Sequence, residues 1–150
     1  MTKCLYRVIV MTLTVLSLLA CFLPVISVYS GGLESYTIYV RGYNLIEFSA
    51  LGSITLLSPI AVLLLTFGHQ RKATKELALI ALMFSHVISY IHSFHIAHRW
   101  LESVGDSHVS FHFGMLLIPI IFIITVIFSI TCDKARVVVY KLFTAKKEGF

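Results

Sequence analysis

Four long apolar stretches without any Lys, Arg, Asp or Glu fill most of this 150-residue chain. They run from Val8 to Leu33, from Phe48 to Gln70, from Leu77 to His98 and from Ser107 to Cys132. Each is about as long as the ~20 residues that a helix needs to cross the hydrocarbon layer of a membrane, where one charged side chain costs roughly 3 kcal/mol. The pattern predicts an all-α membrane protein, a bundle of four transmembrane helices.

The predicted spans cover about residues 8–29, 50–68, 77–97 and 112–132, which leaves room for a single domain. Composition agrees, because 58% of the residues are hydrophobic, a share that suits contact with lipid. The net charge of +5 does not indicate nucleic acid, since the basic residues flank the spans and form no stripe interleaved with aromatic residues.

The basic residues are divided unevenly between the two sides of the predicted membrane. Arg41 and Arg99 lie on one side, and the other ten of the twelve Lys and Arg lie on the opposite side: Lys3, Arg7, Arg71, Lys72, Lys75, Lys134, Arg136, Lys141, Lys146 and Lys147. Cytoplasmic loops carry the Lys and Arg excess, so we expect both termini and the 69–76 loop to be cytoplasmic. Residues 134–147 alternate basic and apolar side chains, which predicts an interfacial segment on anionic lipid.

The predicted outer loop between the first two spans has the pattern of a β-hairpin. Val25 to Tyr29 and Tyr36 to Val40 are rich in β-branched and aromatic residues, and Gly31-Gly32 lies between them. Such residues favour strands, and glycines favour the turn. We therefore expect a short outer-face hairpin after the first helix.

The segment ending at Cys21 is similar to a bacterial lipoprotein signal. Basic residues, an apolar run and then Leu18-Leu19-Ala20-Cys21 follow one another, and such a signal would be cut before the cysteine, which would then be acylated. Residues 22–29 stay apolar where a mature lipoprotein turns polar, and Leu19 fits poorly the small residue preferred there. We expect the first segment to remain in place.

One side of the third span carries small residues. Ala78, Ala81, Ser85 and Ser89 follow one another at spacings of 3, 4 and 4, which places them on one face of a helix. Small side chains let helices approach closely in lipid, so we predict that this stripe packs against another helix. The bulkier Leu79, Phe84 and Ile91 are then predicted to face lipid or the periphery of the bundle.

Histidine is concentrated near the predicted outer end of the third and fourth spans. Six of the seven lie within 27 residues, and His92, His95 and His112 combine neighbouring helices with similar depth. Neutral imidazoles bind transition metals, and one histidine from each of two helices can ligate a haem. A metal or haem site is therefore one interpretation. In the other, these histidines only form hydrogen bonds between helices, and no cofactor is bound.

Two runs carry a resemblance to a known group of proteins. Leu23-Pro24-Val25-Ile26-Ser27-Val28 and the segment from Tyr43 to Gly52 resemble small bacterial four-span inner-membrane proteins. The resemblance covers residues 20–65 and implies a multi-pass protein of the bacterial cytoplasmic membrane without assigned chemistry. The layout also resembles four-span immunity proteins against pore-forming bacteriocins. Claudin-like tetraspans share it, but the Trp and paired Cys of their first outer loop are missing here.

The sequence contains no catalytic motif that we can identify, because no Gly-x-Ser-x-Gly frame or comparable nucleophile and base is present. We expect a protein that is not an enzyme and that works in the lipid bilayer through helix or loop contacts with a membrane-protein partner or a second copy. The alternatives are a histidine-based metal or haem protein at the outer face, and an immunity-type protein against a pore-forming toxin.

Overall fold

The computed structural model describes residues 3–30, 36–68, 71–103 and 107–147, and most of these residues are helical. The four long helices are α1 (Lys3–Ala20), α3 (Gly52–Phe67), α4 (Lys72–Ser103) and α5 (Gly114–Lys147). The shorter elements are the 3-10 turn η1 (Gly42–Asn44), helix α2 (Leu45–Phe48) and strands β1 (Pro24–Ser30), β2 (Tyr36–Arg41) and β3 (Ser107–Phe111).

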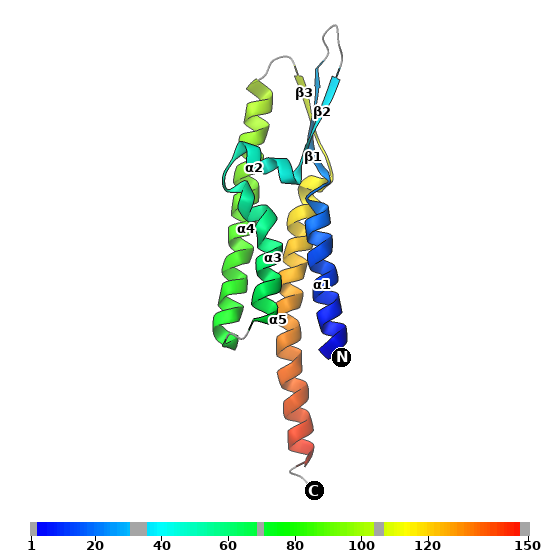
Figure 1. Cartoon of the computed structure of the whole chain (residues 1–150), viewed down its shortest axis with the longest axis vertical. Coiled ribbons are helices and arrows are strands. Elements are labelled where there is room, and N and C mark those ends of the chain that lie inside the picture. The colour runs from blue at the N-terminus through cyan, green and yellow to red at the C-terminus, as the bar shows by residue number, and fades with distance from the viewer. Residues whose placement is uncertain (1–2, 31–35, 69–70, 104–106, 148–150) are drawn as a thin grey trace.

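The long helices run side by side as a bundle, and the three strands stand beyond one end of it (Figure 1). Because α1 leads into β1 and β3 leads into α5, the strands continue two of the helices, while α4 extends past α3 beside them. We call this the strand end. The α3–α4 connection lies at the opposite end, with Arg7, Arg71, Lys72 and Lys75, and we call it the basic end.

The strands form one antiparallel sheet in the order β2-β1-β3. Ser27 at the middle of β1 pairs with Tyr39 of β2 and with Ser110 of β3. The pairing of β1 with β2 confirms the predicted hairpin strands, whereas Gly31-Gly32 lies outside the described residues. The third strand was not predicted, and it extends the predicted hairpin to a three-stranded sheet in a mostly helical fold.

The first predicted span is longer than the helix that the structure contains. Helix α1 ends at Ala20, and three tight backbone hydrogen bonds, such as Cys21 N–H to the Leu18 carbonyl at 3.1 Å, turn the chain into β1. Pro24 cannot continue a helix, and the β-branched residues after it favour a strand. At the other terminus, residues 134–147 continue α5 as one helix and do not form a separate segment.

Within the described residues, two helices are long and apolar enough to cross a membrane, namely α4 and the Gly114–Thr131 part of α5. The apolar parts of the other two long helices, Leu5–Ala20 and Gly52–Phe67, are shorter. The two longer helices favour association of the protein with a membrane.

Two apolar clusters lie in the interior of the part of the chain that the structure describes. The larger one lies where the strands meet the bundle and includes the fully buried Val25, Ile26, Leu45 and Ala97. The second lies deeper in the bundle and consists of Val62, Leu79, Phe122 and Val126, which we call the inner apolar cluster. It draws on α3, α4 and α5 and therefore holds three helices together.

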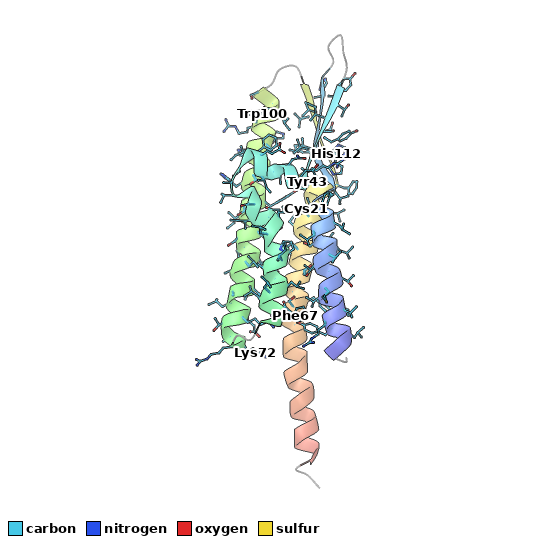
Figure 2. The ribbon with its side chains drawn as sticks, viewed as in Figure 1. Cys21, Tyr43, Phe67, Lys72, Trp100 and His112 are labelled. Atoms are coloured by element: carbon cyan, nitrogen blue, oxygen red, sulfur yellow. The ribbon has the colours of Figure 1, made fainter. Side chains whose placement is uncertain are left out.

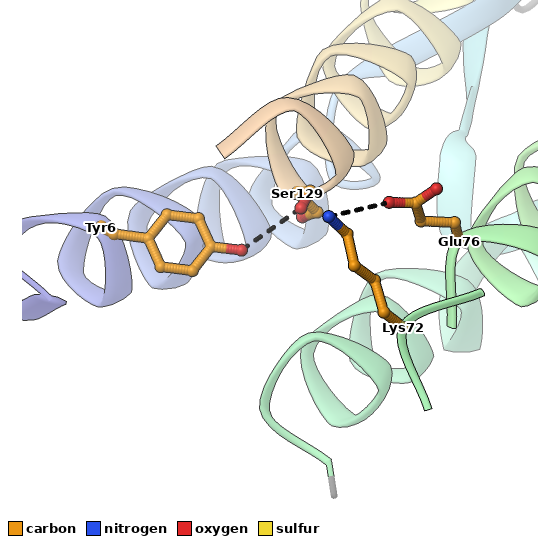
Figure 3. A network of polar contacts seen from close by, with 4 residues as sticks. All are labelled: Tyr6, Lys72, Glu76 and Ser129. Atoms are coloured by element: carbon orange, nitrogen blue, oxygen red, sulfur yellow. Dashed lines mark hydrogen bonds and ion pairs between the residues drawn. The ribbon is translucent and has the colours of Figure 1, made fainter. Parts of the chain in front are cut away.

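Polar contacts join the helices at the basic end. Figure 3 shows the Tyr6 hydroxyl, which donates to the Ser129 carbonyl at 3.3 Å and so ties α1 to α5. In the same view Lys72 forms an ion pair with Glu76 one turn along α4, with 4.0 Å between Nζ and Oε1. Lys75 is buried and donates to the Thr66 carbonyl at 2.9 Å, a carbonyl in the last turn of α3. The Lys75 contact ties the start of α4 to the end of α3.

Candidate functional site: the open face of the strand layer

The sheet has two chemically different faces, because successive side chains of a strand point to opposite sides. Ile26 and Val28 of β1 point to one side and are 0% and 6% exposed. Their cross-strand partners on that side, Val40, Ile38, Val109 and Phe111, are also apolar. This is the face that an apolar environment must cover.

The strand-end part of α4 covers part of the apolar face, whereas Ile38 and Phe111 remain 49% and 56% exposed. Phe111 of β3 packs against two rings of α4, with ring centroids 5.9 Å from Phe94 and 5.1 Å from His98. Ala97 and Leu101 of α4 are buried in the same cluster as the strand residues. His98 also lies 3.4 Å from Glu102 on its own helix. The strands are therefore held on a rigid support, which is how binding surfaces are commonly positioned.

The other side of the sheet, which we call the open face, carries hydroxyl, imidazole and aromatic groups. It consists of Ser27 and Tyr29 on β1, Thr37 and Tyr39 on β2, and His108 and Ser110 on β3. Tyr29 is 47% exposed and Tyr39 is 56% exposed, and Thr37, His108 and Ser110 are also exposed. Tyrosine supplies a large rigid contact area with a polar tip, and it is enriched in protein–protein interfaces.

His112 closes the base of the open face, where β3 meets α5 (Figure 2). Its Nε2 lies 2.8 Å from the Ser27 hydroxyl, and its ring centroid lies 5.8 Å from that of Tyr39. The His112 N–H donates to the Val25 carbonyl at 3.1 Å. A histidine held by its ring and its backbone in this way orders the neighbouring tyrosine, so His112 acts here as a structural residue.

The three predicted cofactor ligands do not come together. His92 and His95 are exposed on α4, whereas His112 is half-buried and bonded to Ser27 of β1. Within the part of the chain that the structure describes, no group of three or more His, Cys, Asp or Glu side chains is placed to hold a metal ion. Similar depth along the bundle does not by itself make two helices present their side chains to each other, and the predicted metal or haem site stays a prediction.

The predicted packing stripe is rotated from the face that α4 buries. Ser89 is buried and Ala78 is half-buried, but Ala81 and Ser85 are exposed. The buried residues of α4 are Lys75, Leu79, His86, Ser89, Tyr90, Ser93, Ala97 and Leu101. Leu79, predicted to face lipid, is 0% exposed and belongs to the inner apolar cluster. Helix α4 meets both α3 and α5, and the space between three helices is filled by a large side chain.

Cys21 is buried at the junction between α1 and the strands, and Figure 2 marks its position near Tyr43. Its carbonyl accepts a hydrogen bond from the Tyr43 N–H at 2.9 Å, and its thiol lies 3.6 Å from the Ser17 carbonyl. A cysteine at 1% exposure does not present its sulfur for acylation in this fold. That the segment before Cys21 is not cleaved stays a prediction.

Sequence reasoning gave too little weight to His86. It is fully buried between α3 and α5, with Nδ1 2.5 Å from the Ser58 hydroxyl and its ring stacked on Phe122. The available signal was an ionisable residue in the middle of a charge-free stretch, which by default indicates a functional or structural polar contact. The partners could not be found from the sequence, because Ser58 lies 28 residues away.

Comparison with known proteins adds no family to these observations. A scan against protein-family models and searches of curated proteins and of solved structures found no match to this chain. The resemblance to small bacterial four-span proteins therefore stays a prediction.

Proposed function

We propose that this chain is a four-span membrane protein that binds a partner outside the membrane through the open face of its strand layer. The proposed membrane location rests on the distribution of apolar side chains over the surface of the bundle. Large apolar residues are exposed on every long helix, for example Val15 at 53%, Leu64 at 69%, Phe84 at 59% and Ile124 at 49%. A bundle surrounded by water would expose such residues only in scattered positions.

The interior of the bundle supports the same proposal, because it contains many small polar residues. Ser17, Ser58 and Ser129 are each at most 2% exposed, and Thr125 and His86 are fully buried. A helix of a water-soluble bundle places its polar residues outside. In lipid the preference is reversed, since small and hydroxyl-bearing residues allow close helix contact and hydrogen bonding between helices.

The two shorter helices are compatible with spanning. At about 1.5 Å per residue, the 18 residues of α1 and the 16 residues of α3 extend roughly 27 and 24 Å, against a hydrocarbon layer of about 30 Å. Local thinning of the bilayer and side chains that reach the interface accommodate a mismatch of this size.

Charge sets the proposed orientation. Arg7, Arg71, Lys72 and Lys75 gather at the basic end, and the excess of Lys and Arg belongs on the cytoplasmic side. The strand end, with Arg41 and Arg99, then faces the outside of a bacterial cytoplasmic membrane. In this orientation the open face is in water, where Tyr29, Tyr39 and His108 can reach a partner.

Cysteine labelling tests the number of spans. In a variant without Cys4, Cys21 and Cys132, single cysteines are introduced as Thr37→Cys, Thr74→Cys and Ser103→Cys at exposed positions. Four spans predict that a membrane-impermeant maleimide labels positions 37 and 103 in intact cells, and position 74 only after permeabilisation. If α4 and α5 alone crossed the membrane, positions 37 and 74 would lie on the same side, and their equal labelling would contradict the proposal.

Photo-crosslinking tests the binding surface. A photoreactive amino acid replaces Tyr39 on the open face, and in a matched control it replaces Leu57, which is 58% exposed on α3 and is proposed to face lipid. We expect a protein adduct of discrete mass from position 39 and none from position 57. An adduct of twice the mass of the chain identifies a second copy as the partner. Absence of adducts at position 39, and also at Tyr29, would refute the partner-binding role.

A further inference from the structure

His86 has an unmet hydrogen-bonding group in the middle of the bundle. Its Nδ1 contacts the Ser58 hydroxyl, and Phe122 stacks on its ring with 3.8 Å between centroids and 15° between planes. Its Nε2 has no hydrogen-bond partner among the described residues. A neutral imidazole carries a donor on one nitrogen and an acceptor on the other, so Nε2 needs a partner in either tautomer.

Two other buried hydroxyl groups, on α3 and α4, also lack a hydrogen-bond partner within the described ranges. Thr55 is 1% exposed and Ser93 is 0% exposed, and neither hydroxyl oxygen has a hydrogen-bond partner in the part of the chain that the structure describes. The Ser58–His86 contact sets the register of the antiparallel helices α3 and α4. Thr55 is one turn from Ser58 toward the strand end, and Ser93 is two turns from His86 in the same direction. The unmet groups therefore belong to one stretch of the α3–α4 contact.

Pro59 explains why this stretch is polar. Proline has no N–H, so the carbonyl four residues earlier, that of Thr55, loses its helical donor. The Ser58 hydroxyl lies 3.3 Å from that carbonyl and also contacts His86. A hydroxyl has one hydrogen, so Ser58 donates to either the carbonyl or the imidazole. If it donates to the carbonyl, Nδ1–H donates to Ser58 and Nε2 is an acceptor; if it donates to Nδ1, Nε2–H is a donor. A ligand at Nε2 must be able to do both.

The inner apolar cluster closes this stretch on the side of the basic end. Phe122, which stacks on His86, packs there with Val62, Leu79 and Val126. Lys75 and Thr66 lie beyond the cluster, in the turns next to the α3–α4 connection. On the strand-end side, Ala97 and Leu101 of α4 follow Ser93 and belong to the larger apolar cluster. The polar stretch is thus enclosed between the two apolar clusters.

We propose that His86, Thr55 and Ser93 hold a shared cluster of water molecules between α3 and α4. A buried water commonly makes about three hydrogen bonds to polar groups that would otherwise be unsatisfied. Water is small, neutral, and both a donor and an acceptor, which matches the tautomer exchange at Ser58 and His86. The site is separate from the open face, so the result of the crosslinking experiment does not affect it.

The sign of a stability change tests the water cluster. Thr55→Val keeps the shape of the side chain and removes the hydroxyl. If Thr55 ligates water, the melting temperature of the detergent-solubilised protein falls, because the water loses a partner. If the hydroxyl is truly unsatisfied, the melting temperature rises, because a desolvation penalty is removed, and the proposal is wrong.

Thr125→Val is the matched control, because the Thr125 hydroxyl already donates to the Ile121 carbonyl of its own helix at 2.7 Å. We expect a smaller fall in melting temperature for Thr125→Val than for Thr55→Val. If the melting temperature of Thr125→Val fell as much as that of Thr55→Val or more, the Thr55→Val result would not support bound water.

Coupling between sites is the second readout. Thr55→Val and Ser93→Ala are combined, and the loss of stability is compared with the sum of the single losses. A shared water cluster predicts a loss clearly smaller than the sum, because the first substitution already disrupts the cluster. Strict additivity would show that the two hydroxyls are independent and would overturn the proposal.

Discussion

The hydroxyl of Tyr90 on α4 donates a hydrogen bond to the carbonyl oxygen of Met115 on α5 at 2.9 Å. Pro119, inside α5, lies four residues after Met115 and has no N–H to offer that carbonyl. The side chain of one helix thus supplies the bond that the other helix lacks. The contact lies close to the strand end and joins two helices without a charge.

Tyr90→Phe should lower the free energy of unfolding by about 1 kcal/mol, since the ring remains and one hydrogen bond is lost. Thermal unfolding in detergent measures the change. In a Pro119→Ala background the helix provides its own N–H to Met115, so the same substitution should cost clearly less. An equal cost in both backgrounds would show that Tyr90 does not substitute for the missing N–H.

The buried face of α4 predicts a contrast between two serines on that helix. Ser89 is 4% exposed, whereas Ser85 is exposed. Ser89→Leu should destabilise the bundle by about 1–3 kcal/mol, because the larger side chain overpacks the helix contact. Ser85→Leu should have little effect on the same melting curve. The reverse order would mean that the originally predicted stripe, with Ala81 and Ser85, faces another helix after all.

The two lysines at the start of α4 should differ in importance. Lys75 is buried and donates to the Thr66 carbonyl, and hydrogen bonds that involve a charged group contribute roughly 1.5–3 kcal/mol. Lys75→Met should therefore lower stability by about that amount. Lys72 is half exposed and 4.0 Å from Glu76, so Lys72→Met should change stability by less than about 1 kcal/mol. Similar losses in urea unfolding of the two detergent-solubilised variants would argue against a specific role for Lys75.

His112 should act through Ser27 and not through a metal ion. We expect His112→Ala and Ser27→Ala to show coupled losses in a double-mutant cycle, of order 1 kcal/mol, because both remove the same 2.8 Å contact. His92→Ala, at an exposed position, serves as the control and should be silent. Neither added Zn²⁺ nor a chelator should shift the melting temperature. A metal-dependent shift abolished by both His112→Ala and His92→Ala would restore the metal interpretation.

Local chemistry along the chain was sufficient to predict the four long helices and the first two strands. Charge-free apolar stretches favour helices whose backbone groups are satisfied internally, and the β-branched residues of Val25–Tyr29 and Tyr36–Val40 favour extended chain. Both signals depend on neighbouring residues, so they survive without knowledge of the fold. The exact end of α1 could not be predicted in this way, because apolar character continues from Ala20 into β1 and does not mark the change from helix to strand.

Only the tertiary structure decided which residues meet. The five residues of β3 become a strand because β1 offers them an unpaired edge, and their sequence carries little strand signal of its own. Leu79 faces inward because three helices leave a space of its size. His112 contacts Ser27, which is 85 residues away in the sequence, and Tyr90 contacts Met115, which is 25 residues away. Helix periodicity places side chains on a face, but the rotation of each helix depends on the summed packing of its neighbours, which no single segment contains.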